Sequence, residues 1–198
     1  MNFFKNIFGK YKKEIIKEDS PYLAPQKDPK EIEFAKKFTE KGGKFIFSEN
    51  RKDTLKYFRQ ILAENGWGNL DLKSDSKSLN SFFKLDTNQE FSENKIPSTQ
   101  VLSCEYLIAN KGAILICSHQ IKDLKLNEIP ENLIILASSA QFVDDVSEAM
   151  TLINTRYKEN LPSNITTLNA FDPDKEENFL SYGSSTKNLY LLVQEESY

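Results

Sequence analysis

Short apolar runs alternate with longer amphipathic segments along most of this chain. Each run is flanked by polar or turn-forming residues, which is typical of a buried strand. The runs that predict strands lie at Lys44–Phe47, Val101–Ser103, Ala113–Cys117, Leu133–Leu136 and Leu189–Val193. Because short buried strands alternate with helical segments, the pattern predicts an α/β fold with a mainly parallel sheet flanked by helices.

Two amphipathic segments near the start of this pattern predict helices. The first begins at Asp28-Pro29, with Asp28 as the expected N-cap, and ends at Gly42-Gly43. The end of a helix favours glycine, because glycine readily adopts the left-handed conformation of a helix C-cap. The second helix covers about 52–65 and has its apolar residues on one face.

Weaker patterns predict the remaining elements. A strand is expected near 70–72, a short helix near 77–84 and a longer helix over 140–156. Residues 104–110 are expected to form a helical turn between two strands. Residues 85–98 are polar and without periodicity, and therefore predict a loop.

The first part of the chain differs from the rest in charge and composition. Residues 1–17 combine aromatic and aliphatic positions at near-helical spacing with several lysines, and residues 18–29 are rich in proline and charge. We therefore expect two parts, a basic amphipathic segment with its linker over 1–29 and an α/β domain over 30–198. A helix over 1–17 could bind an anionic membrane surface or a partner groove, or pack on its own domain.

Composition excludes several classes of protein. The net charge of −3 gives no general reason to expect nucleic-acid binding. No apolar run approaches the roughly 18 residues of a membrane span, and the N-terminus lacks the apolar core of a signal peptide, so we expect a cytoplasmic protein. With one histidine and two cysteines, we predict no metal or cofactor site.

These few reactive side chains have ordinary structural interpretations. His119 follows a predicted strand and is expected in an exposed loop, and Cys117 is expected to be a small buried residue. Cys104 could act as a nucleophile only beside a base. The acidic run at 172–177 is expected to cap a short helix, with cation binding as the alternative.

Two polar turns are candidate sites for an anionic ligand. In the first, Gly112 would let the backbone approach the ligand and Lys111 would supply a positive charge, next to Asn110. The second turn precedes the last strand and offers backbone amides and hydroxyl groups at Gly183, Ser184 and Ser185. We expect the two turns to meet at one edge of the sheet, although tight turns without a ligand have the same composition.

The segment Tyr106–Leu115 resembles a motif of the LUD domain family, the LutC/YkgG-like proteins of lactate utilisation. That family carries Ile-Ala-Glu-Thr-Gly-Thr in a strand–turn–strand element, and Ile108, Ala109 and Gly112 match it. Asn110, Lys111 and Ala113 stand where Glu, Thr and Thr are usual. Nearer the C-terminus, Glu177 and Gly183 match a second family pattern, and the order of elements agrees over about residues 30–194.

The resemblance implies a NagB/RpiA/CoA-transferase-like fold with ligands at the carboxyl ends of the strands. It also implies an accessory, ligand-binding role in the use of lactate or another small organic acid, with Glu177 among the ligand-binding residues. Two cysteines are too few for an iron–sulfur cluster, so electron transfer would belong to partner subunits that carry such clusters. Two alternatives stay open, namely an enzyme acting on a phosphorylated or CoA-linked metabolite, and a non-catalytic interaction module that docks through its N-terminal helix.

Overall fold

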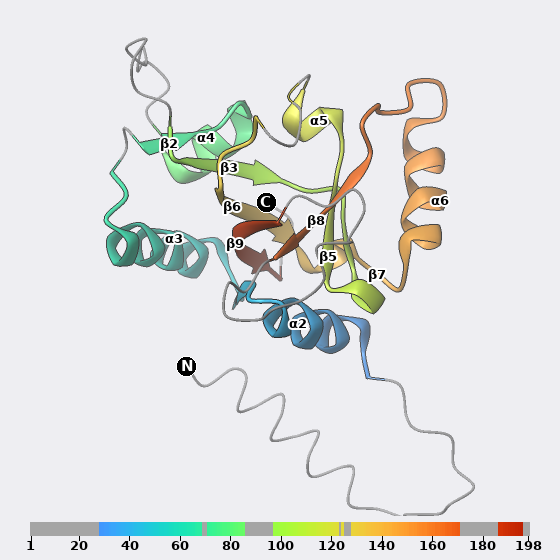
Figure 1. Ribbon diagram of the computed structural model, residues 1–198, viewed down its shortest axis with the longest axis horizontal. Coiled ribbons are helices and arrows are strands. Elements are labelled where there is room, and N and C mark those ends of the chain that lie inside the picture. Colours follow the sequence, from blue (N-terminus) through green and yellow to red (C-terminus); the bar gives the residue numbers. More distant parts are fainter. Residues whose placement is uncertain are drawn as a thin grey trace, which may run out of the picture.

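The computed structural model of the chain describes residues 28–68, 71–85, 97–122, 124, 128–170 and 186–195. Helices and strands alternate in the first part of the chain, and several strands follow one another directly in the rest (Figure 1). The α-helices are α2 (Lys30–Glu40), α3 (Arg51–Asn65), α4 (Lys77–Phe83), α5 (Ser118–Ile121) and α6 (Val146–Tyr157). The strands are β1 (Lys44–Ser48), β2 (Leu72–Lys73), β3 (Thr99–Ser103), β4 (Tyr106–Ile108), β5 (Ala113–Ile116), β6 (Asn132–Ser138), β7 (Phe142–Val143), β8 (Thr166–Ala170) and β9 (Thr186–Gln194). Two short 3₁₀ turns, η2 (Ala109–Lys111) and η3 (Ser139–Gln141), complete the described elements.

The described strands form one sheet with two halves. In the order β2-β3-β6-β9, with β1 also beside β9, all neighbouring strands are parallel. The sheet continues through β8, β5, β4 and β7, where β5 is antiparallel to both of its neighbours. The carboxyl ends of β1, β3, β6 and β9 therefore share one edge of the parallel half.

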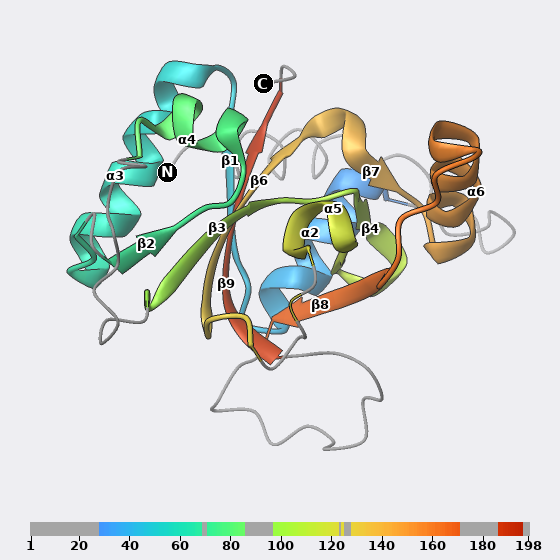
Figure 2. The same cartoon turned by 90° about the horizontal axis from the view of Figure 1, so that it is seen from above.

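Alternation along the central strands sends side chains to two apolar layers. Successive residues of a strand point to opposite faces of a sheet, and both faces of this one are covered. On one face, α2 packs through Phe34 and Phe38 against Leu133, Ile135, Leu189 and Leu191. On the other, α3 and α4 pack against Ile134, Leu136, Tyr190 and Leu192. Figure 2 shows α2 on one side of the parallel strands and α3 with α4 on the other.

A third apolar layer lies under α6. Ala149 and Ile153 of this helix pack against Tyr106 and Ile108 of β4 and against Leu115 of β5. These side chains are all at most 5% exposed. The layer attaches α6 to the antiparallel half of the sheet, where it brings the end of the helix close to the start of β4.

The predicted fold class is confirmed, since the chain forms an α/β structure with a mostly parallel sheet. All five predicted strands are present, and the helices predicted over 52–65 and 77–84 are found as α3 and α4. None of the described helices has the length and apolar composition that a membrane crossing requires. The segment over 1–17 and the acidic run at 172–177 lie outside the described residues.

Some local predictions are wrong. Residues 104–110 form no helical turn at their start, because Tyr106–Ile108 are buried and pair with β5 and β7 as a strand. The helix predicted from 140 begins at Val146, where the Asp145 side chain accepts a hydrogen bond from the Glu148 amide. Asp28 makes no cap and instead forms an ion pair with Lys36 at 2.5 Å.

Candidate functional site

A buried carboxyl group lies where the parallel half of the sheet meets the antiparallel half. Glu105 occupies the bend between β3 and β4 and is 2% exposed. Gln141 holds this bend, because its Nε2 donates to the carbonyls of Cys104 at 2.6 Å and of Glu105 at 3.1 Å. Its Oε1 accepts from the Ser138 amide at 2.6 Å. The amide side chain therefore connects the ends of β3 and β6 and fixes the direction of Glu105.

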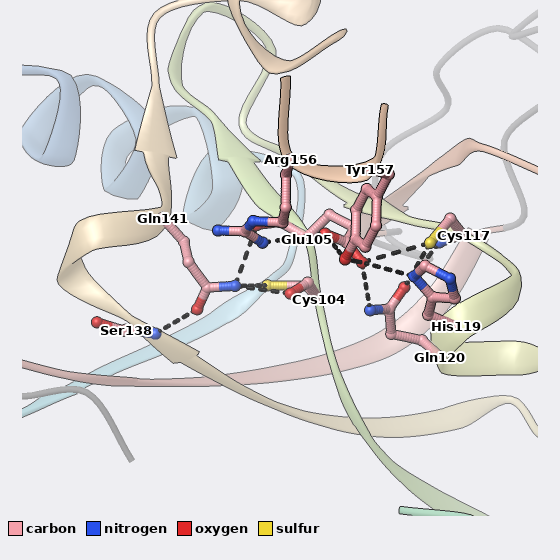
Figure 3. Close-up of polar contacts among 9 residues, drawn as sticks. All are labelled: Cys104, Glu105, Cys117, His119, Gln120, Ser138, Gln141, Arg156 and Tyr157. Atoms are coloured by element: carbon pink, nitrogen blue, oxygen red, sulfur yellow. Dashed lines mark hydrogen bonds and ion pairs between the residues drawn. The ribbon is translucent and has the colours of Figure 1, made fainter. Parts of the chain in front are cut away.

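Three side chains with nitrogen or oxygen donors form hydrogen bonds to the Glu105 carboxylate, as Figure 3 shows. Gln120 Nε2 donates to Oε1 at 2.8 Å. The Tyr157 hydroxyl lies 3.1 Å from both carboxylate oxygens, and one Arg156 nitrogen lies 3.4 Å from Oε2. Such partners are needed because a buried carboxylate without compensation is costly.

A thiol and an imidazole approach the same carboxylate from α5. Cys117 Sγ lies 3.4 Å from Glu105 Oε1, and His119 Nδ1 lies 3.7 Å from the same oxygen. Cys117 is the N-cap of α5, where Gln120 Oε1 accepts from its amide at 2.9 Å and from its sulfur at 3.2 Å. The His119 ring also contacts the Tyr157 ring, with centroids 4.7 Å apart. Glu105, Cys117, His119, Gln120, Arg156 and Tyr157 are called the Glu105 cluster below.

The two thiols of the chain are poorly suited to act as nucleophiles in this state. Burial, together with the neighbouring Glu105 carboxylate, raises the pKa of the Cys117 thiol to about 11. Burial also raises the pKa of Cys104 far above its ordinary value, again with a contribution from Glu105. Because the thiolate is the reactive form, both cysteines lack the activation that a catalytic thiol requires.

A small cavity adjoins the Glu105 cluster. It has a volume of about 130 Å³ and lies between α4, the carboxyl end of β3 and α5. His119 and Gln120 line it from the side of the cluster. Its other polar residues are Asp75, Ser76, Ser103 and Lys122. Lys122 Nζ lies 3.7 Å from Asp75 Oδ1, with 64% of the lysine side chain exposed.

The predicted turn at Asn110, Lys111 and Gly112 lies at the other end of the β4–β5 hairpin from Glu105. Its carbonyl groups are used by α2, since Lys37 Nζ donates to Asn110 O at 2.9 Å and Lys41 Nζ to Lys111 O at 2.6 Å. The ligand-binding role of these three residues stays a prediction. Glu177, Gly183, Ser184 and Ser185 lie outside the described residues, and so does the proposed meeting of the two turns.

Sequence reasoning interpreted two residues of the cluster and missed the others. Cys117 is buried as expected, but it contacts a carboxylate, and His119 lies in α5 with 44% of its side chain exposed. Glu105 carried one signal, because it is a single acidic residue inside an otherwise apolar stretch. Arg156 and Tyr157 gave no such signal in the sequence, since only folding brings the end of α6 to the bend between β3 and β4.

Comparisons with known proteins place the chain in a family context. The family model of the LUD domain matches residues 32–187. A crystal structure of a DUF162 family protein from Deinococcus radiodurans has a similar fold, with a TM-score of 0.56 and 15% sequence identity. That similarity covers 83% of this chain and 96% of the other. No curated protein matches the sequence.

Proposed function

This chain belongs to the LUD domain family, and on that premise we propose that it binds a small organic acid such as lactate. Its role would be that of an accessory, ligand-binding subunit in organic-acid utilisation. The observation that carries the proposal is the polar cavity of about 130 Å³ beside the Glu105 cluster. It opens at the carboxyl end of β3, and ligands of α/β proteins bind at this edge of the sheet.

The size of the cavity favours a small acid over a large cofactor-linked metabolite. Pockets for drug-sized ligands usually enclose about 300–1,000 Å³. A cavity of about 130 Å³ suits a molecule of a few carbon atoms and cannot enclose a CoA or nucleotide group. This comparison supports the accessory hypothesis over an enzyme acting on CoA-linked metabolites.

The lining offers the groups that a hydroxy acid requires. A carboxylate would pair with the Lys122 ammonium group, and a hydroxyl group would exchange hydrogen bonds with Ser103 or His119. Asp75 forms ion pairs with Lys73 and Lys122, whose ammonium groups lie within 3.9 Å of its carboxylate. These ion pairs keep the two ammonium groups at the rim of the cavity. The lining thus combines the ammonium group of Lys122 and the carboxylate of Asp75 with uncharged donors and acceptors on Ser76, Ser103 and Gln120.

Binding without independent catalysis agrees with the chemistry of the chain. Both thiols have raised pKa values, which keeps them protonated near neutral pH. Oxidation of an organic acid needs an electron acceptor, and two cysteines are too few to hold an iron–sulfur cluster. We therefore assign the redox step to partner subunits that carry such clusters.

Calorimetric titration of the full chain tests the proposal. The ligands are L-lactate, D-lactate and pyruvate, with inorganic phosphate and coenzyme A for the alternative enzyme hypothesis. Lys122→Ala is expected to weaken acid binding by about tenfold, as the loss of a charged hydrogen bond worth roughly 1.5 kcal/mol does. Lys56→Ala is the matched control, because this exposed lysine lies on α3 and does not line the cavity. Binding of coenzyme A or phosphate without binding of any acid would contradict the proposal.

A further inference from the structure

Three side chains of the Glu105 cluster offer metal-binding atoms at close range. One carboxylate oxygen of Glu105, the Cys117 sulfur and one imidazole nitrogen of His119 all lie within 4.8 Å of one another. We propose that these three residues bind a zinc ion. The donor set combines sulfur, nitrogen and oxygen, which are the protein ligands that zinc accepts.

The spacing of the donor atoms agrees with a tetrahedral site. Zinc bonds of about 2.0–2.3 Å place neighbouring ligand atoms of a tetrahedron roughly 3.3–3.6 Å apart. Glu105 Oε1 lies 3.4 Å from Cys117 Sγ and 3.7 Å from His119 Nδ1. The two distances that involve the carboxylate are thus close to those of a tetrahedral site. A rotation of the half-exposed His119 side chain would shorten the distance between its nitrogen and the Cys117 sulfur, which is at most 4.8 Å.

The fold places the three ligands before any metal arrives. Tyr106 pairs with Leu115, and the Glu105 amide donates to the Leu115 carbonyl at 2.9 Å, so the open end of the β4–β5 hairpin brings Glu105 beside Cys117. His119 follows two residues later in the first turn of α5. A site built on a hairpin and a helix start is preorganised, because its ligands are held by main-chain hydrogen bonds.

The two oxygens of Glu105 face different partners. Oε1 faces Cys117 and His119, whereas Arg156 contacts Oε2 at 3.4 Å. The guanidinium group therefore lies on the opposite side of the carboxylate from the proposed ion. Gln120 and Tyr157 bond the same carboxylate, and such hydrogen bonds from outside the ligand set orient a metal-binding group.

Metal binding accounts for a thiol and an imidazole beside a buried carboxylate. Zn²⁺ would form a bond to Cys117 sulfur as the thiol proton leaves to solvent, since zinc binds the thiolate. The double positive charge would then balance the carboxylate and the thiolate. Arg156, with 54% of its side chain exposed, balances the carboxylate only weakly.

The fourth coordination position would face the small cavity. His119 and Gln120 belong both to the Glu105 cluster and to the cavity lining. Three protein ligands with one open position are typical of zinc sites that bind water or a ligand. An acid in the cavity would therefore be within reach of the ion, although zinc binding itself does not depend on the acid.

Cobalt and zinc titrations of the full chain under reducing conditions test this inference without any organic acid. Co²⁺ bound to a thiolate gives a charge-transfer absorption in the near ultraviolet, and Zn²⁺ affinity is measured by competition with a chromophoric chelator. We expect one ion per chain. The absorption should disappear in Cys117→Ser, and Zn²⁺ affinity should fall at least about tenfold in His119→Gln, as losses at metal sites do.

Cys104→Ser is the matched control, because it alters the other buried thiol, whose sulfur lies 3.7 Å from Gln141 Nε2. This variant should keep the absorption and the affinity. His119→Gln changes a half-exposed side chain and therefore remains informative if Cys117→Ser fails to fold. Absence of the thiolate absorption in the unmodified chain, or its persistence in Cys117→Ser, would overturn the zinc site. Failure of acid binding would leave this result unaffected.

Discussion

Gly112 lies directly against the main chain of Phe38. A Cβ atom at Gly112 would lie 2.6 Å from the Phe38 backbone nitrogen. The backbone of Gly112 is also in the left-handed region, with φ of 54°. The turn after β4 thus approaches α2 so closely that only glycine fits, which gives this family-motif glycine a packing role whether or not the turn binds a ligand.

Gly112→Ala is expected to destabilise the fold by roughly 2–5 kcal/mol. A left-handed alanine costs about 1–2 kcal/mol, and displacement of the α2 backbone adds a cost typical of overpacking, about 1–3 kcal/mol. Gly66→Ala separates the two effects, because Gly66 has φ of 66° but no atom within 4 Å of its Cβ position. Urea unfolding measures both variants, and equal losses would contradict the packing role.

Lys122→Gly is expected to raise stability while it weakens acid binding. Lys122 has φ of 53° and ψ of −126°, a conformation that glycine adopts without strain. Relief of such strain is worth about 1 kcal/mol or more. Lys122→Ala is the control, since alanine keeps the strain and should show no gain. Thermal unfolding and calorimetry of both variants give the result, and a loss of stability in Lys122→Gly would contradict the assignment of strain.

Gln100→Met is expected to stabilise the chain by roughly 1–3 kcal/mol, as the removal of an unpaired buried amide does. Gln100 is fully buried in β3, and neither atom of its amide has a hydrogen-bond partner among the described residues. Methionine fills a similar volume without polar atoms.

Gln141→Met is the matched control for Gln100→Met. The Gln141 amide bonds three main-chain groups, at Ser138, Cys104 and Glu105. Its removal leaves those groups without partners and should cost about 1–3 kcal/mol. The free energy of unfolding in denaturant should therefore rise in Gln100→Met and fall in Gln141→Met. A fall in both variants would contradict the view that the Gln100 amide has no partner.

Tyr157→Phe is expected to destabilise the chain by about 1–2 kcal/mol, because a buried carboxylate loses one hydrogen bond. The hydroxyl lies 3.1 Å from both oxygens of Glu105, and phenylalanine keeps the ring beside His119. Tyr57→Phe serves for comparison, since Tyr57 is a partly buried ring of α3 packed against the apolar layer that α3 and α4 share, away from the Glu105 cluster. That change should stay within about 0.5 kcal/mol.

Much of the fold was predictable from pattern, because buried strands of a parallel sheet are continuous apolar runs. Leu133–Leu136 and Leu189–Val193 are therefore recognisable as strands from their apolar residues alone. β8 is not, since Thr166, Thr167 and Asn169 interrupt its apolar positions. It forms because β5 and β9 supply hydrogen-bonding partners on either side, which is a property of the sheet and not of the segment.

The family motif was visible in the sequence, but the Glu105 cluster was not. Ile108, Ala109 and Gly112 are close in sequence, and the resemblance that rests on them agrees with the match of the LUD domain model. Cys117 and His119 are also neighbours, yet their chemistry depends on Glu105, which is brought to them by the β4–β5 hairpin.

The sequence by itself determined the fold class, since hydrophobic periodicity depends on residues that are close along the chain. It also determined the family and the scarcity of thiols and imidazoles. Only the tertiary structure decided which polar residues meet, because contacts between Glu105 and Arg156 or Tyr157 span more than fifty residues. Their approach depends on how α6 packs on β4 and β5. This packing is set by apolar side chains that are far apart in sequence, so no local pattern predicts it.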